Sequence, residues 1–218
     1  MENQPQTSNV KSKSIPRWLQ IFLLVGGVIL IVVGLISIFG GTASSALVDK
    51  FNEFQNPTAQ VANSLQNASD LLTGIAAKEQ AKNYAGAVAD LQTALTKLND
   101  TDSLVKSLTS LVSEFKDVVN RISDQNAKTA GLHFIDVSNS RNAAVLKMTS
   151  DTRQLVNLII TYYDGLAHGK TTELDEPKLT AMAEQVTADA QSIAKINTDL
   201  DLAAQDLAKA AGFKLVKK

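Results

Sequence analysis

The sequence contains no cysteine, so neither a disulfide nor a thiolate metal site can contribute to its stability. A domain outside the cytoplasm without disulfides must be stabilised by packing alone, which suits a prokaryotic envelope better than a small disulfide-linked ectodomain. The two histidines, His133 and His168, have no partner residue at a metal-ligand spacing. We therefore expect no metal, no cofactor and no catalytic residue, and we do not expect an enzyme.

Basic residues also do not outnumber acidic residues. The chain has 21 Lys and Arg against 22 Asp and Glu, and residues 1–17 hold three of the basic and one of the acidic side chains. The rest is mildly acidic and offers no basic stripe that could hold a phosphate backbone. Nucleic acid is not an expected partner.

Charged residues are absent altogether from residues 18–41, which are dense in Ile, Val, Leu and Phe. At about 1.5 Å per residue, roughly twenty such residues cross a hydrocarbon layer of about 30 Å, whereas the apolar part of a cleavable signal usually has about 7–15. Lys11, Lys13 and Arg17 precede the run, so the positive-inside rule places the N-terminus in the cytoplasm. The sequence predicts a single-pass protein of the cell membrane, with the lipid bilayer as its partner through residues 18–41.

This prediction divides the chain into four parts. Residues 1–17 are polar and are expected to be a disordered cytoplasmic tail. The transmembrane helix, 18–41, leads into a juxtamembrane connector, 42–56, and then an extracytoplasmic helical-bundle domain, 57–218. An alternative is a secreted protein cleaved after Ala46, because Ser44, Ser45 and Ala46 satisfy the small-residue rule; the length of the apolar run argues against it.

Apolar residues after position 42 recur every three or four residues almost everywhere, which predicts an all-α fold. The clearest helix covers Glu176 to about Ala211. Pro177 fits the first turn of this helix, and Asp175 or Glu176 can cap its N-terminus. Gly212 marks its C-terminal end. Its core positions repeat every seven residues and form a heptad row: Leu179, Val186, Ile193, Leu200 and Leu207. The fold class is therefore an elongated antiparallel helical bundle with coiled-coil-like packing.

Four further helices are expected upstream. One begins at Asn56-Pro57, after a possible short helix over 45–55. A second covers 84–98 and ends at the capping residues 99–102, although one continuous helix over 84–125 is the alternative because a seven-residue spacing runs through the junction. A wide apolar face over 104–122 predicts contacts on more than one side, at the centre of the bundle.

The fourth upstream helix is expected over residues 138–167, with Val145, Met148, Leu155 and Ile159 on one stripe and Thr152 at the missing step. Residues 126–137 precede it, and Gly131 interrupts the pattern there. We expect this segment to be a packed loop or a kinked turn.

Residues 82–95 are similar to the turn and second helix of a tetratricopeptide repeat, through Tyr84, Ala87, Leu91 and Ala94. The Trp and Gly of the first helix are absent and no second copy follows, whereas such solenoids need about three repeats. We expect a plain helical hairpin.

The sequence thus favours a non-catalytic, membrane-anchored binding or spacer module of the cell envelope. Its heptad rows require a packing partner, which is another helix of the chain, a second copy in a homo-oligomer, or a partner envelope protein. The alternative is an accessory sensor or receptor ectodomain that binds a ligand and acts through a partner membrane protein. A polar group buried in an apolar seam would favour the sensor, and Asp189 and Thr152 are the candidates.

Overall fold

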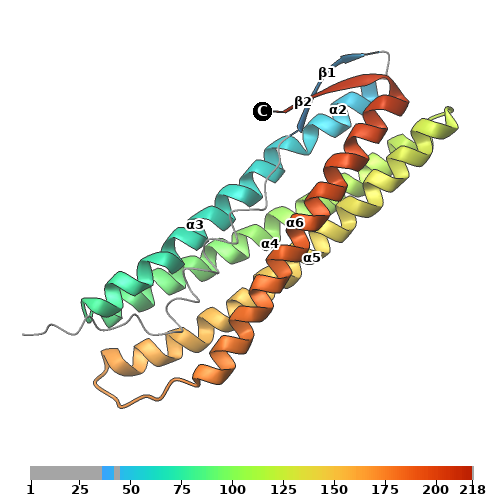
Figure 1. Cartoon of the computed structure of the whole chain (residues 1–218). Helices are drawn as coiled ribbons and strands as arrows, with labels where there is room; N and C mark the ends of the chain where they lie inside the picture. Colours follow the sequence, from blue (N-terminus) through green and yellow to red (C-terminus); the bar gives the residue numbers. More distant parts are fainter. Residues whose placement is uncertain (1–35, 42–44, 218) are drawn as a thin grey trace, which may run out of the picture.

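The structure is a computed structural model that describes residues 36–41 and 45–217. Its elements are, in chain order, β1 (Ile36–Gly41), α2 (Ser45–Glu53), α3 (Gln55–Gln80), α4 (Tyr84–Asn120), α5 (Gln125–Ala167), α6 (Glu176–Ala211) and β2 (Phe213–Lys217). The long helices α3 to α6 run antiparallel in sequence order and form an elongated bundle (Figure 1). The described part of the chain is therefore an antiparallel helical bundle, and the predicted all-α class is confirmed.

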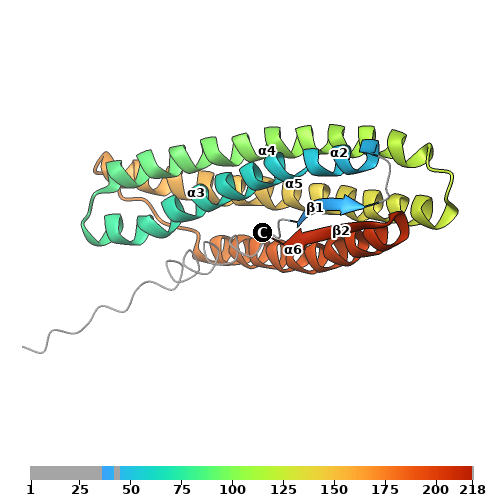
Figure 2. The same ribbon diagram turned by 90° about the horizontal axis from the view of Figure 1, so that it is seen from above.

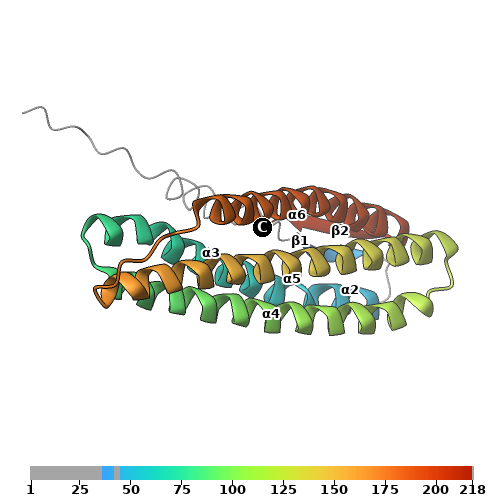
Figure 3. The same ribbon diagram turned by 90° about the horizontal axis from the view of Figure 1, so that it is seen from below.

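Each long helix packs on the next one in the chain, α3 on α4, α4 on α5 and α5 on α6. Helix α2 continues the line of α3 and packs on α4, as the views from above and below show (Figures 2 and 3). Helix α4 thus has neighbours on more than one side, which its wide apolar face predicted. The helices α3 and α4 form the expected hairpin.

Both ends of α6 lie where the sequence predicted them. The side chain of Asp175 accepts a hydrogen bond from the backbone N–H of Lys178 at 3.0 Å, and Pro177 lies in the first turn. Gly212 ends the helix with φ 76°, the left-handed conformation that a residue without Cβ adopts at low cost. Within the predicted row, Leu200 alone is partly exposed, because it borders the cavity described below.

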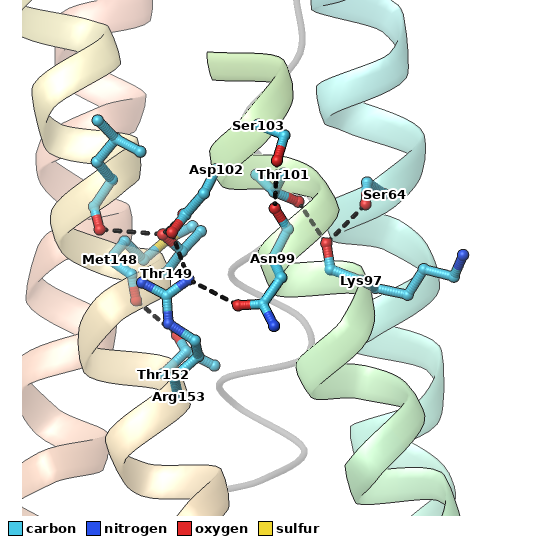
Figure 4. A network of polar contacts seen from close by, with 11 residues as sticks. Ser64, Lys97, Asn99, Thr101, Asp102, Ser103, Met148, Thr149, Thr152 and Arg153 are labelled. Atoms are coloured by element: carbon cyan, nitrogen blue, oxygen red, sulfur yellow. Dashed lines mark hydrogen bonds and ion pairs between the residues drawn. The ribbon is translucent and has the colours of Figure 1, made fainter. Parts of the chain in front are cut away.

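The break expected at 99–102 is wrong, and α4 is continuous. Asp102 accepts a hydrogen bond from the Thr149 hydroxyl at 2.5 Å and forms an ion pair with Arg153, both on α5 (Figure 4). Arg153 also donates to the side chain of Asn99 at 3.3 Å. The residues that resemble a helix cap therefore bind the neighbouring helix instead.

Hydroxyl groups at the same level bond to the backbone of α4 itself. Thr101 and Ser103 donate to the carbonyls of Lys97 and Asn99, four residues earlier, at 2.9 and 3.2 Å. Ser64 of α3 donates to the carbonyl of Lys97 at 2.8 Å and joins the two helices there (Figure 4). Cap-forming residue types are thus accommodated inside the helix.

The prediction of a loop over 126–137 is also wrong, because α5 already begins at Gln125. Asp124 caps it by accepting from the backbone N–H of Ala127 at 2.8 Å. A Cβ on Gly131 would lie 2.8 Å from both methyl carbons of Val119 on α4. The glycine therefore permits a close approach of two helices and does not interrupt the helix.

The short helix expected over 45–55 is present as α2, and a break at Phe54 separates it from α3. Pro57 accounts for the break, since it has no N–H to donate to the carbonyl of Glu53 and its ring crowds that carbonyl. Thr58 then donates to the carbonyl of Phe54 at 3.1 Å, so the helical course resumes at once.

The end of the predicted transmembrane helix is not helical. Residues 18–35 lie outside the described residues, but residues 36–41 form β1, which pairs antiparallel with β2, from Ile36 opposite Lys217 to Gly41 opposite Phe213. Branched and aromatic residues favour a strand here, and two consecutive glycines disfavour a helix. Among the described residues, no helix combines the length and apolar character that a bilayer crossing requires.

The buried apolar residues form two clusters. The aliphatic cluster joins α3, α4, α5 and α6 and includes Val61, Leu65, Leu72, Ile75, Leu91, Leu98, Val145, Met148, Ile159, Leu179, Val186 and Ile193. The phenylalanine cluster lies where α2, β2 and the α4–α5 turn meet and comprises Leu47, Phe51, Val112, Phe115, Val119, Phe134, Ile135, Ala203, Ala204, Leu207, Ala208 and Phe213.

Candidate functional site

A cavity of about 70 Å³ lies where the two clusters meet. It is bordered by the α2–α3 junction, α4, α5 and α6, so residues far apart in the sequence surround it. The lining residues are Phe51, Phe54, Gln55, Thr58, Leu108, Val112, Phe134, Ser138, Arg141, Asn142, Asn197, Leu200, Asp201 and Ala204. About half are apolar and half are polar or charged, the composition of a site that holds a small amphipathic molecule.

The spacing of these residues follows the helix repeat. Helix α4 contributes positions 108 and 112, and α6 contributes 197, 200, 201 and 204. Helix α5 contributes 134, 138, 141 and 142. Residues three, four or seven positions apart lie on one helix face, so each helix presents a single face to the cavity.

Arg141 is the charged group buried most deeply at this site. Its side chain is 5% exposed, and its Nε donates to the side-chain oxygen of Asn197 on α6 at 2.8 Å. Burial lowers the pKa of the Arg141 guanidinium, although a guanidinium stays protonated in proteins. The cavity is therefore lined by a permanent positive charge held by a neutral amide.

Two further polar residues of α5 lie beside Arg141. Asn142 is 5% exposed and donates to the Thr109 hydroxyl on α4 at 3.3 Å. Ser138 is also buried, one turn before Asn142. These groups make one wall of the cavity polar at a depth where side chains are mostly apolar.

Phenylalanine rings form the opposing wall. The ring centroid of Phe134 is 5.1 Å from that of Phe51 and 6.0 Å from that of Phe54. Phe115, behind them, lies 5.6 Å from Phe134, and Phe213 of β2 lies 6.0 Å from Phe51. Pairs at such distances are worth about 0.5–1.5 kcal/mol beyond their buried area, so this wall is stiff.

One carboxylate completes the lining. Asp201 is partly exposed, and it lies one turn after Asn197 on the same face of α6. The cavity thus contains one fixed cation, Arg141, and one partly exposed acid, Asp201.

The two polar residues singled out from the sequence lie elsewhere and are satisfied within the bundle. Thr152 donates to the carbonyl of Met148 in its own helix at 2.7 Å. Asp189 is 8% exposed, and its two oxygens accept from Lys147 at 2.7 and 2.8 Å. Hydrogen bonding to Asp189, and then to Asp151, raises the pKa of Lys147. Neither residue borders the cavity.

A hydrogen bond between Tyr163 and Glu79 lies beside the aliphatic cluster. The hydroxyl of Tyr163, which is fully buried, donates to Glu79 at 2.8 Å, and its ring stacks on Tyr84 with centroids 6.0 Å apart. Burial raises the pKa of Glu79, and the hydrogen bond from Tyr163 only partly offsets this effect. Burial, assisted by Glu79, raises the pKa of Tyr163 as well. The hydrogen bond between them joins α3 to α5.

Two other kinds of site to consider are a metal centre and a second hollow. In the ranges 36–41 and 45–217, no three His, Cys, Asp or Glu side chains gather as a metal would require. A hollow of about 520 Å³ lies between α2, the α4–α5 turn and the end of α6. It shares no lining residue with the cavity that Arg141 borders.

Sequence reasoning missed Arg141 although a signal was present. The stripe of α5 through Val145, Met148 and Thr152, extended upstream in steps of three and four, reaches Arg141, Ser138 and Phe134. A charged residue at a core position of a long helix is unusual. Asp189 and Thr152, the candidates predicted from the sequence, are buried as well, but Arg141 is the buried charged residue that borders the cavity.

Comparison with known proteins gave no relative. No protein-family model matches the chain, and no curated protein or solved structure matches it significantly. A function can therefore be inferred only from the sequence and the geometry of the chain itself.

Proposed function

We propose that this protein is a non-catalytic, membrane-anchored helical bundle outside the cytoplasm that binds a small ligand between its helices. The observation that carries the proposal is the buried Arg141 beside a phenylalanine wall. Polar side chains of α5 and α6, among them Arg141, Asn142 and Asn197, line the same space as phenylalanine rings. A small number of polar groups in an otherwise apolar lining is typical of small-molecule sites.

The anchor is supported by the sequence alone. If β1 takes residues 36–41, the uncharged run still retains Trp18 to Leu35, eighteen residues, within the range of about 17–25 that a spanning helix uses. Lys11, Lys13 and Arg17 still precede it and favour a cytoplasmic N-terminus. The bundle would then lie outside the cytoplasm, with its helices packed in the coiled-coil-like manner that the heptad rows predict.

A sensor acting through a partner membrane protein is the form of this function that the geometry favours. The phenylalanine cluster contacts β2 through Phe213, and β2 pairs with β1, which adjoins the predicted span. A ligand that shifted Phe51 or Phe134 would thus act on the segment that leads to the membrane.

Cleavage after Ala46 is the weaker alternative. Ala46 lies in the first turn of α2, so cleavage there would cut the helix and remove β1 from its partner. The mature product would lose the strand pair.

Protease treatment of intact cells tests the location. We expect added protease to digest the bundle and to spare an epitope tag on the N-terminal tail, and we expect the purified protein to have the intact mass of the full chain. A mature N-terminus at Leu47, or a bundle protected from protease, would contradict the membrane-anchored proposal. Neither outcome depends on whether the cavity binds a ligand.

A further inference from the structure

The charged groups of the cavity are engaged within the chain. Arg141 donates to Asn197 at 2.8 Å, a bond that joins α5 to α6, and Asp201 also has a partner in the bundle. Neither charge is therefore left free for a ligand. The groups that can recognise a ligand are the uncharged polar side chains of the lining.

The hydroxyl of Ser138 is such a group. Ser138 borders the cavity and is 6% exposed, and within the described part of the chain its hydroxyl has no hydrogen-bond partner. In the same helix Ser140 and Thr152 donate to the carbonyl four residues earlier, at 3.0 and 2.7 Å. Every described side-chain polar atom that is sealed from solvent has a partner, so the Ser138 hydroxyl reaches accessible space, and the cavity is the space that it borders.

Asn142 provides a complementary group. It lies one turn after Ser138 on the same face of α5 and also borders the cavity. Its amide nitrogen donates to the Thr109 hydroxyl at 3.3 Å, whereas its carbonyl oxygen accepts no hydrogen bond from the described residues. A ligand hydroxyl is both an acceptor and a donor, so it can accept from Ser138 and donate to Asn142.

The volume of the cavity sets the size of the ligand. An apolar cavity of about 150 Å³ binds benzene, so each of the six carbon atoms takes roughly 25 Å³. About 70 Å³ then holds roughly three atoms other than hydrogen. The rings of Phe51, Phe54 and Phe134 border the same space and are suited to an alkyl group. An uncharged molecule with one hydroxyl and two carbon atoms matches both the size and the lining.

We infer that this cavity binds a short-chain alcohol of the size of ethanol, with its hydroxyl between Ser138 and Asn142 and its alkyl group against the phenylalanine wall. This site rests on the proposed ligand-binding function and specifies its ligand class. It uses no charged group of the lining, and it does not depend on whether the chain is membrane-anchored.

Methyl NMR of the purified full chain, in mild detergent, follows the titration with ethanol. Leu108, Val112 and Leu200 border the cavity, whereas Leu72 belongs to the aliphatic cluster and does not border it. We expect ethanol to shift the methyl signals of the first three residues and not those of Leu72. The Kd should be on the order of 1–10 mM, because so few atoms limit the affinity.

Three further compounds test the ligand chemistry. Dimethyl sulfide has as many heavy atoms as ethanol but no hydroxyl, so it should bind about three- to tenfold more weakly. Formate is equally small but charged, and no free charge in the lining compensates its desolvation. Cyclohexanol keeps the hydroxyl but exceeds the cavity. Neither formate nor cyclohexanol should shift the cavity methyl signals at up to about 100 mM.

Variants locate the hydroxyl that recognises the ligand. Ser138→Ala should weaken ethanol binding about three- to tenfold and leave the Kd of dimethyl sulfide within about twofold. Ser140→Ala is the matched control, because it removes an exposed hydroxyl of the same helix that already bonds to the carbonyl of Asp136. It should leave the Kd of ethanol within about twofold.

A third variant tests the location of the site from the opposite helix. Ala204→Val narrows the cavity from α6 and should weaken the binding of both ethanol and dimethyl sulfide. If Ala204→Val does not fold, Ser138→Ala still decides the question, because it removes a single oxygen atom.

The outcomes separate this ligand class from the proposed function. Equal affinity for ethanol and dimethyl sulfide, or equal effects of Ser138→Ala and Ser140→Ala, would overturn the alcohol site. Shifts caused by formate or cyclohexanol in place of ethanol would overturn the ligand class and leave the ligand-binding function standing. Cavity methyl signals that no compound shifts at up to about 100 mM would overturn both and leave the membrane location untouched.

Discussion

The two apolar clusters of the bundle differ in the type of side chain that they contain. The aliphatic cluster consists mainly of Leu, Ile, Val and Ala from four parallel or antiparallel helices in regular contact. The phenylalanine cluster gathers aromatic rings from α2, α4, α5 and β2, at the place where α3 begins and α6 ends. Branched aliphatic chains interdigitate at fixed helix spacing, whereas large rings meeting at irregular angles leave space beside them. The cavity lies on the aromatic side of this boundary, and the regular side provides the scaffold.

The largest expected loss of stability comes from the phenylalanine cluster. Phe115 is fully buried, and its ring contacts Phe51, Phe54 and Phe134. Phe115→Ala should lower the free energy of unfolding by about 3–5 kcal/mol, because it removes a ring from the centre of the cluster. Chemical denaturation followed by circular dichroism measures the loss. Phe54→Ala is the control and should cost less, since Phe54 is partly exposed; equal losses would mean that the cluster is not centred on Phe115.

The aliphatic cluster is tested by Ile193→Ala, which should cost about 2–5 kcal/mol, because Ile193 is fully buried in the predicted heptad row. Lys195→Ala, at an exposed position of the same helix, should change stability by no more than about 0.5 kcal/mol. If the row joined two copies of the chain, Ile193→Ala would also make unfolding depend on protein concentration. Thermal melts at several protein concentrations, together with light scattering to determine the oligomeric state, test this. Equal, small effects would contradict a buried α6.

A smaller effect is expected from the polar contact between α4 and α5. Asp102→Ala removes the acceptor of Thr149 and the ion-pair partner of Arg153, and it should cost about 1–3 kcal/mol. Asp100→Ala removes only an exposed ion pair with Lys97 and should be nearly neutral. If the two variants were equally stable, the network of Figure 4 would not be what keeps α4 continuous.

The smallest expected effect is a pH dependence in the aliphatic cluster. Burial raises the pKa of Glu79 above 4.5, so the folded state keeps this proton to higher pH than the unfolded state. Stability should therefore fall as pH rises from about 4.5 through the raised folded pKa, and Glu79→Gln should remove this fall while keeping an acceptor for Tyr163. Melts across that pH window measure it, with Glu184→Gln, at an exposed site on α6, as the control.

The regular parts of the fold could be predicted from sequence and the irregular parts could not. Helix α6 was predicted with both ends because Pro177 and Gly212 act locally on the backbone. Gly131 and Asp102 misled the prediction because they serve contacts with another helix, which no local pattern displays. The cavity depends on Phe51, Phe134 and Asn197 meeting across the bundle, so its position follows only from the tertiary arrangement.

The pairing of β1 with β2 has a consequence for the order of events during synthesis. Every described helix lies between the two strands in the chain. From Gly41 to Phe213 the ribosome must add 172 residues (213 − 41), which at about 5–20 residues per second takes on the order of ten to thirty seconds. During this interval β1 is an unpaired, largely apolar strand edge, the kind of segment that associates with other chains. Its partner becomes available only after the helices of the bundle have emerged, so the bundle is able to form first and β1 gains its native neighbour last.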